Sequence, residues 1–375
     1  MSGGVDSSVA AHLLLEQGYE VIGLFMRVGA KETLEGATGS LLPVPPQSTG
    51  RAHQGCCSAA DAADARFVAG MLGIPFYALN FQEEFDGIIA YFADEYARGR
   101  TPNPCVVCND RIKFGRLFEY ADAVGAKYVA TGHYARIDTV ADRHTLLRGV
   151  DPQKDQSYVL FGLRREVLGR IRFPIGHLTK PEVRAIAARM GFPNHDKPDS
   201  VEICFAPNRD YARVVRERRP DAFVIGEVVD EDGEVIGHHE GLAQYTVGQR
   251  RGLRIAAGRP IYVTRLDVLN NRVVTGGDQA LLCGSLVADR ANLAFGAESE
   301  SFRADVKIRY LHTPAAATVH TLGGDRVRVV FDEPQRAVAP GQAVVFYDGE
   351  VVLGGAWIDR GEPCRENLAD QLAVG

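Results

Sequence analysis

Two cysteines stand at C-x-x-C spacing in the string Thr-Pro-Asn-Pro-Cys-Val-Val-Cys-Asn-Asp-Arg-Ile-Lys-Phe. We expect Cys105 and Cys108 to lie immediately before a helix, whose N-terminus, together with Arg111 and Lys113, favours the thiolate form of a cysteine. The thiolate is the form that attacks an electrophile or binds a metal. The spacing therefore predicts a site of catalysis or metal binding.

A third cysteine, Cys204, lies far downstream in the string Asp-Ser-Val-Glu-Ile-Cys-Phe. The sequence has 7 cysteines, and an odd number in a long chain without an export signal argues against a framework of structural disulfides. We expect Cys56, Cys57, Cys283 and Cys364 to be structural or incidental. The C-x-x-C pair could also hold zinc, but no second Cys/His pair at ligand spacing accompanies it, so zinc is the weaker interpretation.

The other chemical motif is Ser-Gly-Gly-Val-Asp-Ser-Ser, which leads directly into a helical pattern. Two glycines let the backbone approach an anion, hydroxyl groups add donors, and the following helix N-terminus offers N–H groups and a partial positive charge. The motif lacks the Gly-Lys-Ser/Thr of a Walker loop. It predicts a different pyrophosphate site, formed by Ser2, Gly3, Gly4, Val5, Asp6, Ser7 and Ser8.

A phosphate loop of this kind normally follows a buried parallel strand, whereas only Met1 precedes it in this sequence. Either the start of the protein lies further upstream or the chain is truncated. We expect the loss of the strand to expose its neighbours and to weaken nucleotide binding.

An α/β domain with a parallel sheet should position these motifs, because apolar strand-like runs alternate with helical patterns up to about residue 135. The expected strands cover residues 21–26, 74–79 and 127–131, and helices are expected to begin at Ser58 and Asp110. Residues 29–55, rich in Gly, Pro, Ser and Thr, should form a long loop.

The pattern changes after Asp151. Thr179 and Glu182 form a predicted capping box for a helix that ends at Gly191, and short strands separated by turns dominate from Phe223 onward. We therefore expect three parts: a catalytic domain over residues 1–205, of which 151–195 contribute partly to the central domain, a β-rich central domain over 206–280 and a β-barrel over 285–375.

A formal net charge of -6 gives no overall signal for nucleic acid, so a basic surface must be local. Two arginine-rich segments are candidates, although each could be a solvated face. They contain Arg209, Arg213, Arg216, Arg218 and Arg219 in the first segment, and Arg250, Arg251, Arg254 and Arg259 in the second. No apolar run approaches the roughly 20 residues of a membrane span, and no signal peptide is recognisable, which predicts a cytoplasmic protein without a membrane partner.

Several strings together resemble the tRNA-specific 2-thiouridylase family of PP-loop ATP pyrophosphatases. They are the phosphate loop, Thr-Pro-Asn-Pro, Cys-Asn followed by Ile-Lys-Phe, Ala-Thr-Gly-His-Tyr, Lys-Asp-Gln-Ser-Tyr, Ile-Cys-Phe and Gly-Gln-Arg. The resemblance covers essentially the whole chain. It implies an α/β PP-loop domain (adenine nucleotide alpha hydrolase-like), a small central domain and a C-terminal β-barrel. It further implies an ATP-dependent sulfurtransferase that replaces the C2 oxygen of the wobble uridine of tRNA, position 34, with sulfur.

The resemblance also implies roles for individual residues. ATP, with Mg²⁺, would be held by the phosphate loop, Met26 and Gly132. Cys204 would carry persulfide sulfur received from a donor protein, and Cys108 would be the nucleophile that releases it, ending in a disulfide with Cys204. Adenylation would let the C2 oxygen leave with AMP. The residues implied to contact tRNA, the first three at the target base, are Asn103, Pro104, Cys105, His133, Lys154, Asp155, Gln156, Arg309, Tyr310 and Gln342.

Cys105 departs from the family members taken as reference, which carry Asp there. Cys105, Cys108 and Cys204 could instead hold a [4Fe-4S] cluster with one iron open to sulfide, as in related tRNA thiolases. Two alternative functions stay open: another PP-loop enzyme, such as an amidating ligase or a different tRNA modifier, and a tRNA-binding homologue that no longer catalyses because its first strand is missing. The separated cysteine motifs argue against an amidating ligase, which needs no sulfur relay.

Overall fold

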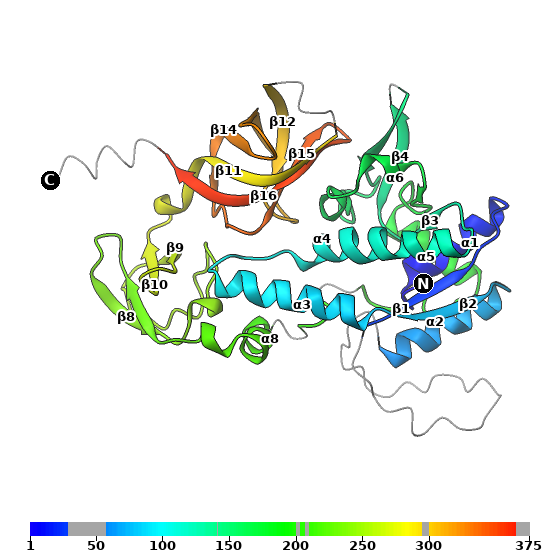
Figure 1. Ribbon diagram of the computed structural model, residues 1–375, viewed down its shortest axis with the longest axis horizontal. Helices are drawn as coiled ribbons and strands as arrows, with labels where there is room; N and C mark the ends of the chain where they lie inside the picture. Colours follow the sequence, from blue (N-terminus) through cyan, green and yellow to red (C-terminus); the bar gives the residue numbers. More distant parts are fainter. Residues whose placement is uncertain (29–57, 141, 200–202, 207–209, 295–299, 365–375) are drawn as a thin grey trace.

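The computed structural model describes residues 1–28, 58–140, 142–199, 203–206, 210–294 and 300–364. An α/β part lies on the right of Figure 1, a small β-rich part at the lower left, and a barrel at the upper left. The expected loop over residues 29–55, Cys56, Cys57 and Arg209 lie outside the described residues. None of the described helices is long and apolar enough to span a membrane.

The α/β part begins with α1 (Val5–Glu16), β1 (Gly23–Arg27), α2 (Ala59–Met71), β2 (Phe76–Asn80) and α3 (Gln82–Ala97). β1 and β2 pair in parallel, as the alternating pattern predicts. The predicted start of α2 is also confirmed: Ser58 Oγ accepts the Asp61 N–H at 3.1 Å, and the Asp61 carboxylate accepts the Ser58 N–H at 3.0 Å.

A continuous helical run carries the C-x-x-C pair: α4 (Pro104–Cys108), the π-helical η1 (Asn109–Arg116) and α5 (Leu117–Ala123). The run begins at Pro104, so the prediction of a helix that starts at Asp110 and follows both cysteines is wrong. Proline suits the first helical position because the N–H that it lacks would have no partner there. Asn103 caps the helix by accepting the Val106 N–H at 3.4 Å.

The rest of this part contains a second parallel pair and a hairpin. Its elements are β3 (Val129–Ala130), β4 (Ala135–Val140), β5 (Arg143–Arg148), η2 (Ser157–Leu160), α6 (Arg165–Leu168), β6 (Ile171–Arg172), α7 (Lys180–Arg189) and α8 (Tyr211–Arg218). β3 pairs with β6, and among the described residues this pair forms a separate sheet from β1–β2. Met1 N donates to the Leu24 carbonyl on β1. The capping box of Thr179 and Glu182 begins α7, and Gly191 follows its end with φ +68°, as predicted.

The small β-rich part is one four-stranded sheet with the order β8-β7-β10-β9. Its elements are η4 (Pro220–Ala222), β7 (Gly226–Val229), β8 (Val235–His239), η5 (Leu242–Gln244), β9 (Tyr262–Asp267) and β10 (Arg272–Gly276). Gly233 and Asn271 sit in the connecting turns with φ +88° and +50°. Short strands joined by tight turns are therefore confirmed for this region.

The barrel follows η6 (Gln279–Leu281) and consists of β11 (Leu282–Leu293), β12 (Ser301–Lys307), β13 (Ala315–Thr321), β14 (Val327–Arg336), β15 (Ala343–Asp348) and β16 (Val351–Pro363). It closes because β11 pairs with both β14 and β16. The predicted C-terminal barrel is thus confirmed. Hairpin β4–β5 of the α/β part extends the same sheet, with Leu147 opposite Val351. No pattern in the sequence indicates that connection.

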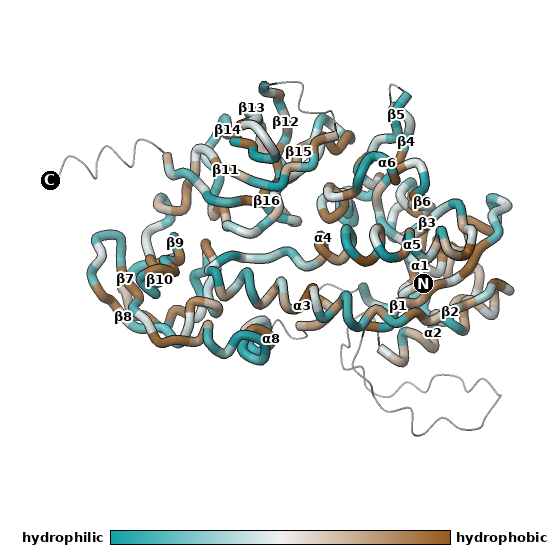
Figure 2. The backbone as a smooth tube through the Cα atoms, in the orientation of Figure 1, coloured by the Kyte–Doolittle hydropathy of each residue, from teal (hydrophilic) through white to brown (hydrophobic). Residues whose placement is uncertain are grey.

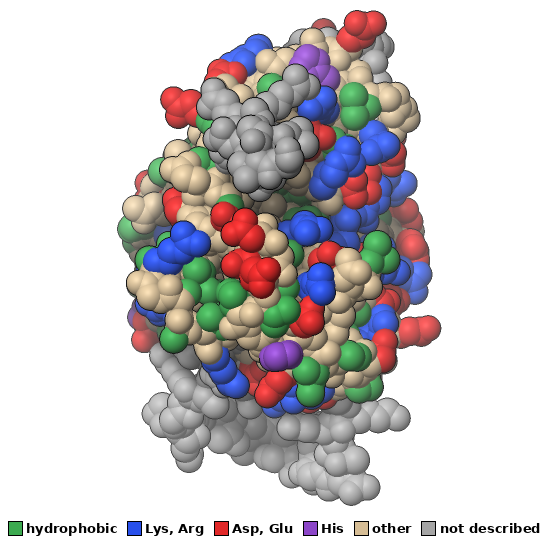
Figure 3. Space-filling view, turned by 90° about the vertical axis from the view of Figure 1, so that its left-hand side faces the viewer, with side chains coloured by type: hydrophobic (Ala, Val, Ile, Leu, Met, Phe, Trp, Pro, Cys, Tyr) green, Lys and Arg blue, Asp and Glu red, His purple; other side chains and the backbone are tan. Residues whose placement is uncertain are grey.

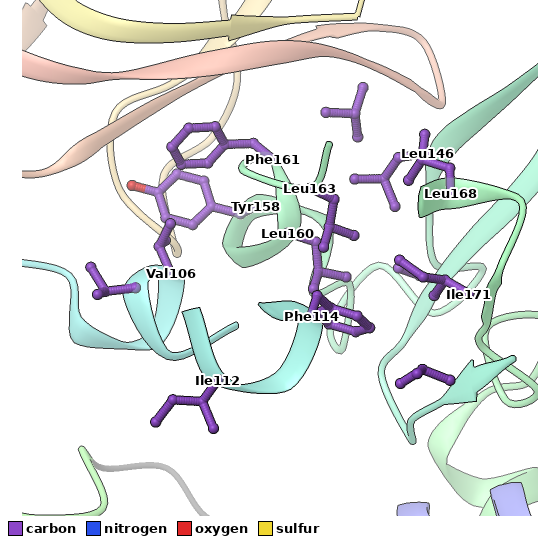
Figure 4. Close-up of a cluster of buried hydrophobic side chains, with 14 of the residues drawn as sticks. Val106, Ile112, Phe114, Leu146, Tyr158, Leu160, Phe161, Leu163, Leu168 and Ile171 are labelled. Carbon is purple, nitrogen blue, oxygen red and sulfur yellow. The ribbon is translucent and has the colours of Figure 1, made fainter. Parts of the chain in front are cut away.

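A single hydrophobic core joins the α/β part to the barrel. It contains Phe85 of α3, Val106 of α4 and Tyr158 of η2, together with Tyr347 and Trp357 of the barrel. Figure 4 shows Val106 close to Tyr158 where α4 passes beneath the barrel strands. The helix with the C-x-x-C pair is therefore held from both sides.

Candidate active site

The phosphate loop is shaped by close backbone packing. Gly3 has φ +75°, and a Cβ there would stand 2.3 Å from the Asp61 carbonyl oxygen, so only glycine fits. The Ser7 and Ser8 hydroxyls each donate to the Gly4 carbonyl at 3.1 Å. Gly4 is the N-cap of α1 and offers no side-chain cap, which leaves the first N–H groups of the helix to bind an anion.

Gly132 lies directly against this loop. A Cβ on Gly132 would be 2.7 Å from both the Asp6 carbonyl carbon and the Ser7 nitrogen. Met26 is half-buried near the carboxyl end of β1, and Gly132 follows β3. Nucleotides bind at the carboxyl ends of parallel strands, beside a helix N-terminus. The structure thus brings Gly132 to the phosphate loop, as an ATP site requires.

A charged network that was not foreseen surrounds the loop. Lys180 Nζ, on a side chain only 9% exposed, lies 2.8 Å from Asp6 Oδ1 and 2.7 Å from Asp199 Oδ1. Tyr134 donates its hydroxyl to Asp6 Oδ1 at 2.8 Å, and Lys154 Nζ lies 2.7 Å from Asp199 Oδ2. Burial raises the pKa of Asp199, but hydrogen bonds from Lys154 and Lys180 outweigh it, and the net pKa is lowered. Asp199 therefore stays ionised near neutral pH.

Two further side chains fix the back of the loop. Asn194 Nδ2 donates to the Gly3 carbonyl and to Ser8 Oγ, both at 3.0 Å. Lys197 Nζ donates to the Gly3 carbonyl at 3.2 Å and pairs with Asp61 and Asp64, each at 2.7 Å. Both side chains come from the stretch before Cys204, whose composition suggests only a linker. Sequence reasoning missed their role because no local motif marks a contact across the fold.

The C-x-x-C pair sits within one turn of α4, with Cys105 exposed and Cys108 half-buried. Cys108 and Cys204 both pack against the core shared with the barrel. Phe205, next to Cys204, makes edge contacts with Phe85 and Phe92 of α3, which runs beside α4 (Figure 1). Over the described residues, no three or more His, Cys, Asp or Glu side chains are gathered so as to hold a metal ion. The three cysteines thus do not fit a [4Fe-4S] cluster in this arrangement.

Aromatic and charged side chains from both parts meet beside Cys105. The Tyr158 and Tyr310 ring centroids are 6.1 Å apart, and Lys307 Nζ lies 5.8 Å from each. The pKa of Tyr310 is raised to about 12, mainly by burial and then by the charges of Asp155 and Cys105. Lys307 and Tyr158, which were not predicted, therefore belong to the same cluster as three predicted tRNA contacts. These contacts are Tyr310, Asp155 and Cys105. Arg309, also predicted, is exposed and donates to the Arg336 carbonyl at 3.2 Å.

Gln342 contacts the turn before α4. Its side-chain nitrogen donates to the carbonyls of Thr101 and Pro102, both at 3.2 Å. The Thr101 N–H donates to the Pro340 carbonyl at 2.7 Å. The loop between β14 and β15 therefore fixes the position of Asn103, Pro104 and Cys105, which begin or cap the helix.

Of three other predicted tRNA contacts, two support the backbone in this structure and the third, His133, contacts a side chain. Asp155 Oδ1 accepts the N–H groups of Gly149 and Ser157 at 3.1 and 3.0 Å, and Gln156 Oε1 accepts the Tyr134 N–H at 2.9 Å. His133 is buried, with Thr131 Oγ1 2.8 Å from its Nδ1. Burial, and then the charge of Lys113, lowers the pKa of His133 well below its usual range, so the ring is neutral at pH 7. Their contact with RNA stays a prediction.

The two arginine-rich segments differ in their partners. On α8, a hydrophilic helix in Figure 2, Arg218 pairs with Asp86 at 2.7 Å, and Arg219, the residue after the helix, pairs with Asp94 at 2.5 Å. In the second segment the arginines are all exposed, and over the described residues none has a carboxylate at ion-pair distance. They are Arg250, Arg251, Arg254 and Arg259. Figure 3 shows basic and acidic side chains interspersed on the face that includes the β-rich part.

Comparison with known proteins agrees with this arrangement. Residues 1–208 match the family model described as the tRNA methyl transferase HUP domain, residues 213–277 the tRNA methyl transferase PRC-barrel domain, and residues 284–358 the aminomethyltransferase beta-barrel domain. The tRNA-specific 2-thiouridylase MnmA of Symbiobacterium thermophilum is 50% identical over 365 residues, which cover 96% of this chain and 91% of that protein. Its counterpart in Geobacter metallireducens is 50% identical over 361 residues, 96% of this chain and 95% of that protein. The chain belongs to the tRNA-specific 2-thiouridylase family.

Proposed function

We propose that this chain uses ATP and Mg²⁺ to convert the wobble uridine of tRNA, position 34, into 2-thiouridine. The observation that carries the proposal is the pairing of a glycine-shaped phosphate loop with a C-x-x-C helix held between the α/β part and the barrel. One motif suits activation of an oxygen by adenylation and the other suits transfer of sulfur. Methyl transfer needs neither a pyrophosphate site nor paired thiols.

The nucleotide half of the site would activate the base. The N-terminus of α1 and the Ser2 and Ser7 hydroxyls would hold the phosphates, with Met26 and Gly132 beside the adenosine. Mg²⁺ typically keeps several waters and binds substrate phosphates with one or two carboxylates. Asp6, whose side chain is 32% exposed, is the carboxylate of the loop that suits this role. Attack of the uridine C2 oxygen on the α-phosphate would release pyrophosphate and leave the base adenylated.

The cysteine half would deliver sulfur. A donor protein would load Cys204 as a persulfide, and the Cys108 thiolate would attack the sulfur bonded to the Cys204 side chain. The terminal sulfur leaves as hydrosulfide and displaces AMP, which carries away the former C2 oxygen. Two thiols are oxidised to the Cys108–Cys204 disulfide as the transferred sulfur is reduced to sulfide, so the electrons balance.

The tRNA would lie across all three parts. Asn103 to Cys105 would meet the base, and Lys154 to Gln156, His133, Arg309, Tyr310 and Gln342 would contact the RNA around it. We assign residues 1–205 to catalysis, 206–280 to a central tRNA-binding domain and 285–375 to the C-terminal barrel. Because ATP and tRNA meet in the cytoplasm, we propose that the enzyme acts there.

The test is incubation with unmodified tRNA, ATP, Mg²⁺ and a persulfide donor, followed by mass analysis of nucleosides. Formation of 2-thiouridine that disappears in Cys108→Ser and Cys204→Ser would support the reaction and its relay. Cys364→Ser, at the end of the barrel, is the matched control and should keep the activity. Intact tRNA binding with no ATP cleavage would instead support the non-catalytic RNA-binding alternative.

A further inference from the structure

Cys105 has no part in the sulfur relay of Cys108 and Cys204, yet it stands next to that relay. Cys105 and Cys108 are three residues apart within α4. Helix geometry puts their Cα atoms about 5 Å apart, inside the range of roughly 4.4 to 6.8 Å that a disulfide spans. The Cα spacing therefore allows a disulfide. The Cβ atoms of residues three apart in a regular helix are about 5–6 Å apart, so the first turn of α4 must tighten locally to bring them within the roughly 3.5–4.5 Å of a disulfide.

The two sulfurs differ in access. Cys105 is exposed, whereas Cys108 is half-buried and, like Cys204, packs against the core shared with the barrel. An outside reductant therefore meets Cys105 before it meets either sulfur of the relay.

The relay leaves a chemical problem. Each turnover ends with Cys108 and Cys204 oxidised, and Cys204 cannot accept new persulfide sulfur until that bond opens. A neighbouring thiolate attacks a disulfide faster than a thiol from solution, because the neighbour is already positioned. Within one turn of α4, Cys105 is such a neighbour of Cys108.

We propose that Cys105 is the resolving thiol of the sulfur relay, a role that rests on the proposed function. The Cys105 thiolate attacks Cys108 sulfur, a Cys105–Cys108 bond forms, and the Cys108–Cys204 bond breaks. The electron pair of the broken bond leaves with Cys204 as a thiolate, which takes up a proton or is reloaded. No net oxidation occurs in this exchange. An external dithiol then reduces the exposed Cys105–Cys108 disulfide.

Disulfide mapping reads out the exchange. Trypsin cuts after Arg100 and Arg111, which places Cys105 and Cys108 together in peptide 101–111. It cuts after Arg189 and Arg209 but not before Pro198, which places Cys204 alone in peptide 190–209. After one turnover without reductant and alkylation in acid, we expect wild-type peptide 101–111 to be two hydrogens lighter and unalkylated, with Cys204 alkylated. Cys105→Ser should instead give peptide 101–111 joined to peptide 190–209.

The second measurement compares later turnovers with the first in each variant, with dithiothreitol as the reductant. The ratio of the steady-state rate to the first-turnover rate should fall roughly tenfold in Cys105→Ser, because resolution becomes intermolecular. Cys105→Asp, which restores the residue of the reference relatives, should show the same low ratio. Cys364→Ser should keep the wild-type ratio.

Distinct results would overturn the two proposals. The wild type could form 2-thiouridine normally while its peptides 101–111 and 190–209 stay joined by a disulfide. That result would contradict the resolving role of Cys105 and leave the proposed function standing. An undiminished ratio in Cys105→Asp would have the same meaning. Iron and sulfide bound to the three cysteines in protein purified without oxygen would end the resolving role together with the Cys108–Cys204 relay, and would leave only the thiolation of tRNA standing. Absence of 2-thiouridine in the first turnover of the wild type would count against the proposed function itself.

Discussion

The phosphate loop and the turn before α4 both start a helix at the candidate site, but they are held in different ways. The phosphate loop is braced by side chains of the α/β part, above all Lys180, Asn194 and Lys197. The turn at Thr101 and Pro102 is braced by main-chain and amide contacts from the barrel. The proposed nucleotide site is thus contained in one part of the molecule, whereas the turn proposed to meet the base depends on contacts between two parts.

This difference implies that the two halves of the reaction can be disabled separately. Changes beside the phosphate loop should abolish adenylation whatever the state of the barrel. Changes in the barrel loop should impair thiolation of tRNA and leave reaction with ATP alone intact. Five predictions sharpen or break this distinction.

Gly132→Ala should have the largest effect. Its Cβ would stand 2.7 Å from backbone atoms of Asp6 and Ser7, so the loop must shift. A displacement on the order of 1 Å at a reacting group costs about 100-fold in rate. We therefore expect tRNA-dependent pyrophosphate release to fall by about that factor.

The matched control is Gly87→Ala in the middle of α3, where a Cβ would meet nothing within 4 Å. Alanine is the better helix former, so this variant should be as active as wild type and about 0.5 to 1 kcal/mol more stable. Wild-type pyrophosphate release by Gly132→Ala would contradict the placement of the nucleotide against this residue.

Lys180→Met should come next. The change leaves the Asp6 and Asp199 carboxylates without their shared cation, on side chains 32% and 27% exposed. Removing one member of a fully buried pair costs 3–5 kcal/mol, and partial exposure reduces this to about 2 kcal/mol. Urea unfolding should show that loss, and Lys180→Arg should recover part of it.

The pH dependence has a defined sign. The folded pKa of Asp199 is lowered below its ordinary value of 3.8. Its contribution to stability is therefore complete above that value and is lost as the pH falls through the folded pKa. Asp199→Asn should flatten the acid side of the stability curve, and an unchanged slope there would show that the network does not stabilise the fold.

Sequence reasoning identified features that depend on local chemistry. These features act on residues only a few positions away, so a short sequence pattern is enough to predict them. They are the string of Ser2 to Ser8, the capping residues Ser58 and Thr179 and the turns of the β-rich part. The helix start at Pro104 was missed because Asp110 is also a plausible first-turn residue. Asn103 and Pro104 nevertheless form the stronger start signal, since they supply the cap and the first helical residue.

Features that depend on distant contacts were out of reach. Hairpin β4–β5 reads as an ordinary pair of strands, and only the fold shows that Leu147 pairs with Val351 of the barrel. Lys180 reads as the first residue of a capped helix, although its ammonium group joins the phosphate loop to Asp199. Where a residue has both a local role and a long-range contact, the sequence pattern predicts only the local role.

Gln342→Ala tests the base-side turn. The variant loses two hydrogen bonds to the carbonyls of Thr101 and Pro102, each worth about 1 kcal/mol or somewhat less where water replaces it. We expect kcat/KM for tRNA thiolation to fall about tenfold, with ATP affinity unchanged by equilibrium dialysis. Gln335→Ala is the control, because Gln335 donates locally to the Glu333 carbonyl at 2.8 Å. A loss of ATP affinity in Gln342→Ala would break the separation of the two halves.

The smallest effect should come from single arginines of the two arginine-rich segments. Arg251 is exposed without a described carboxylate at ion-pair distance, whereas Arg218 already pairs with Asp86 at 2.7 Å. Releasing counterions from one phosphate changes the slope of log affinity against log salt by about 0.7 to 0.9. Arg251→Ala should lower the slope for tRNA by that amount and weaken binding a few-fold, while Arg218→Ala should change neither. Equal effects of the two changes would mean that tRNA displaces Asp86, and that α8 belongs to the RNA surface despite its acidic partners.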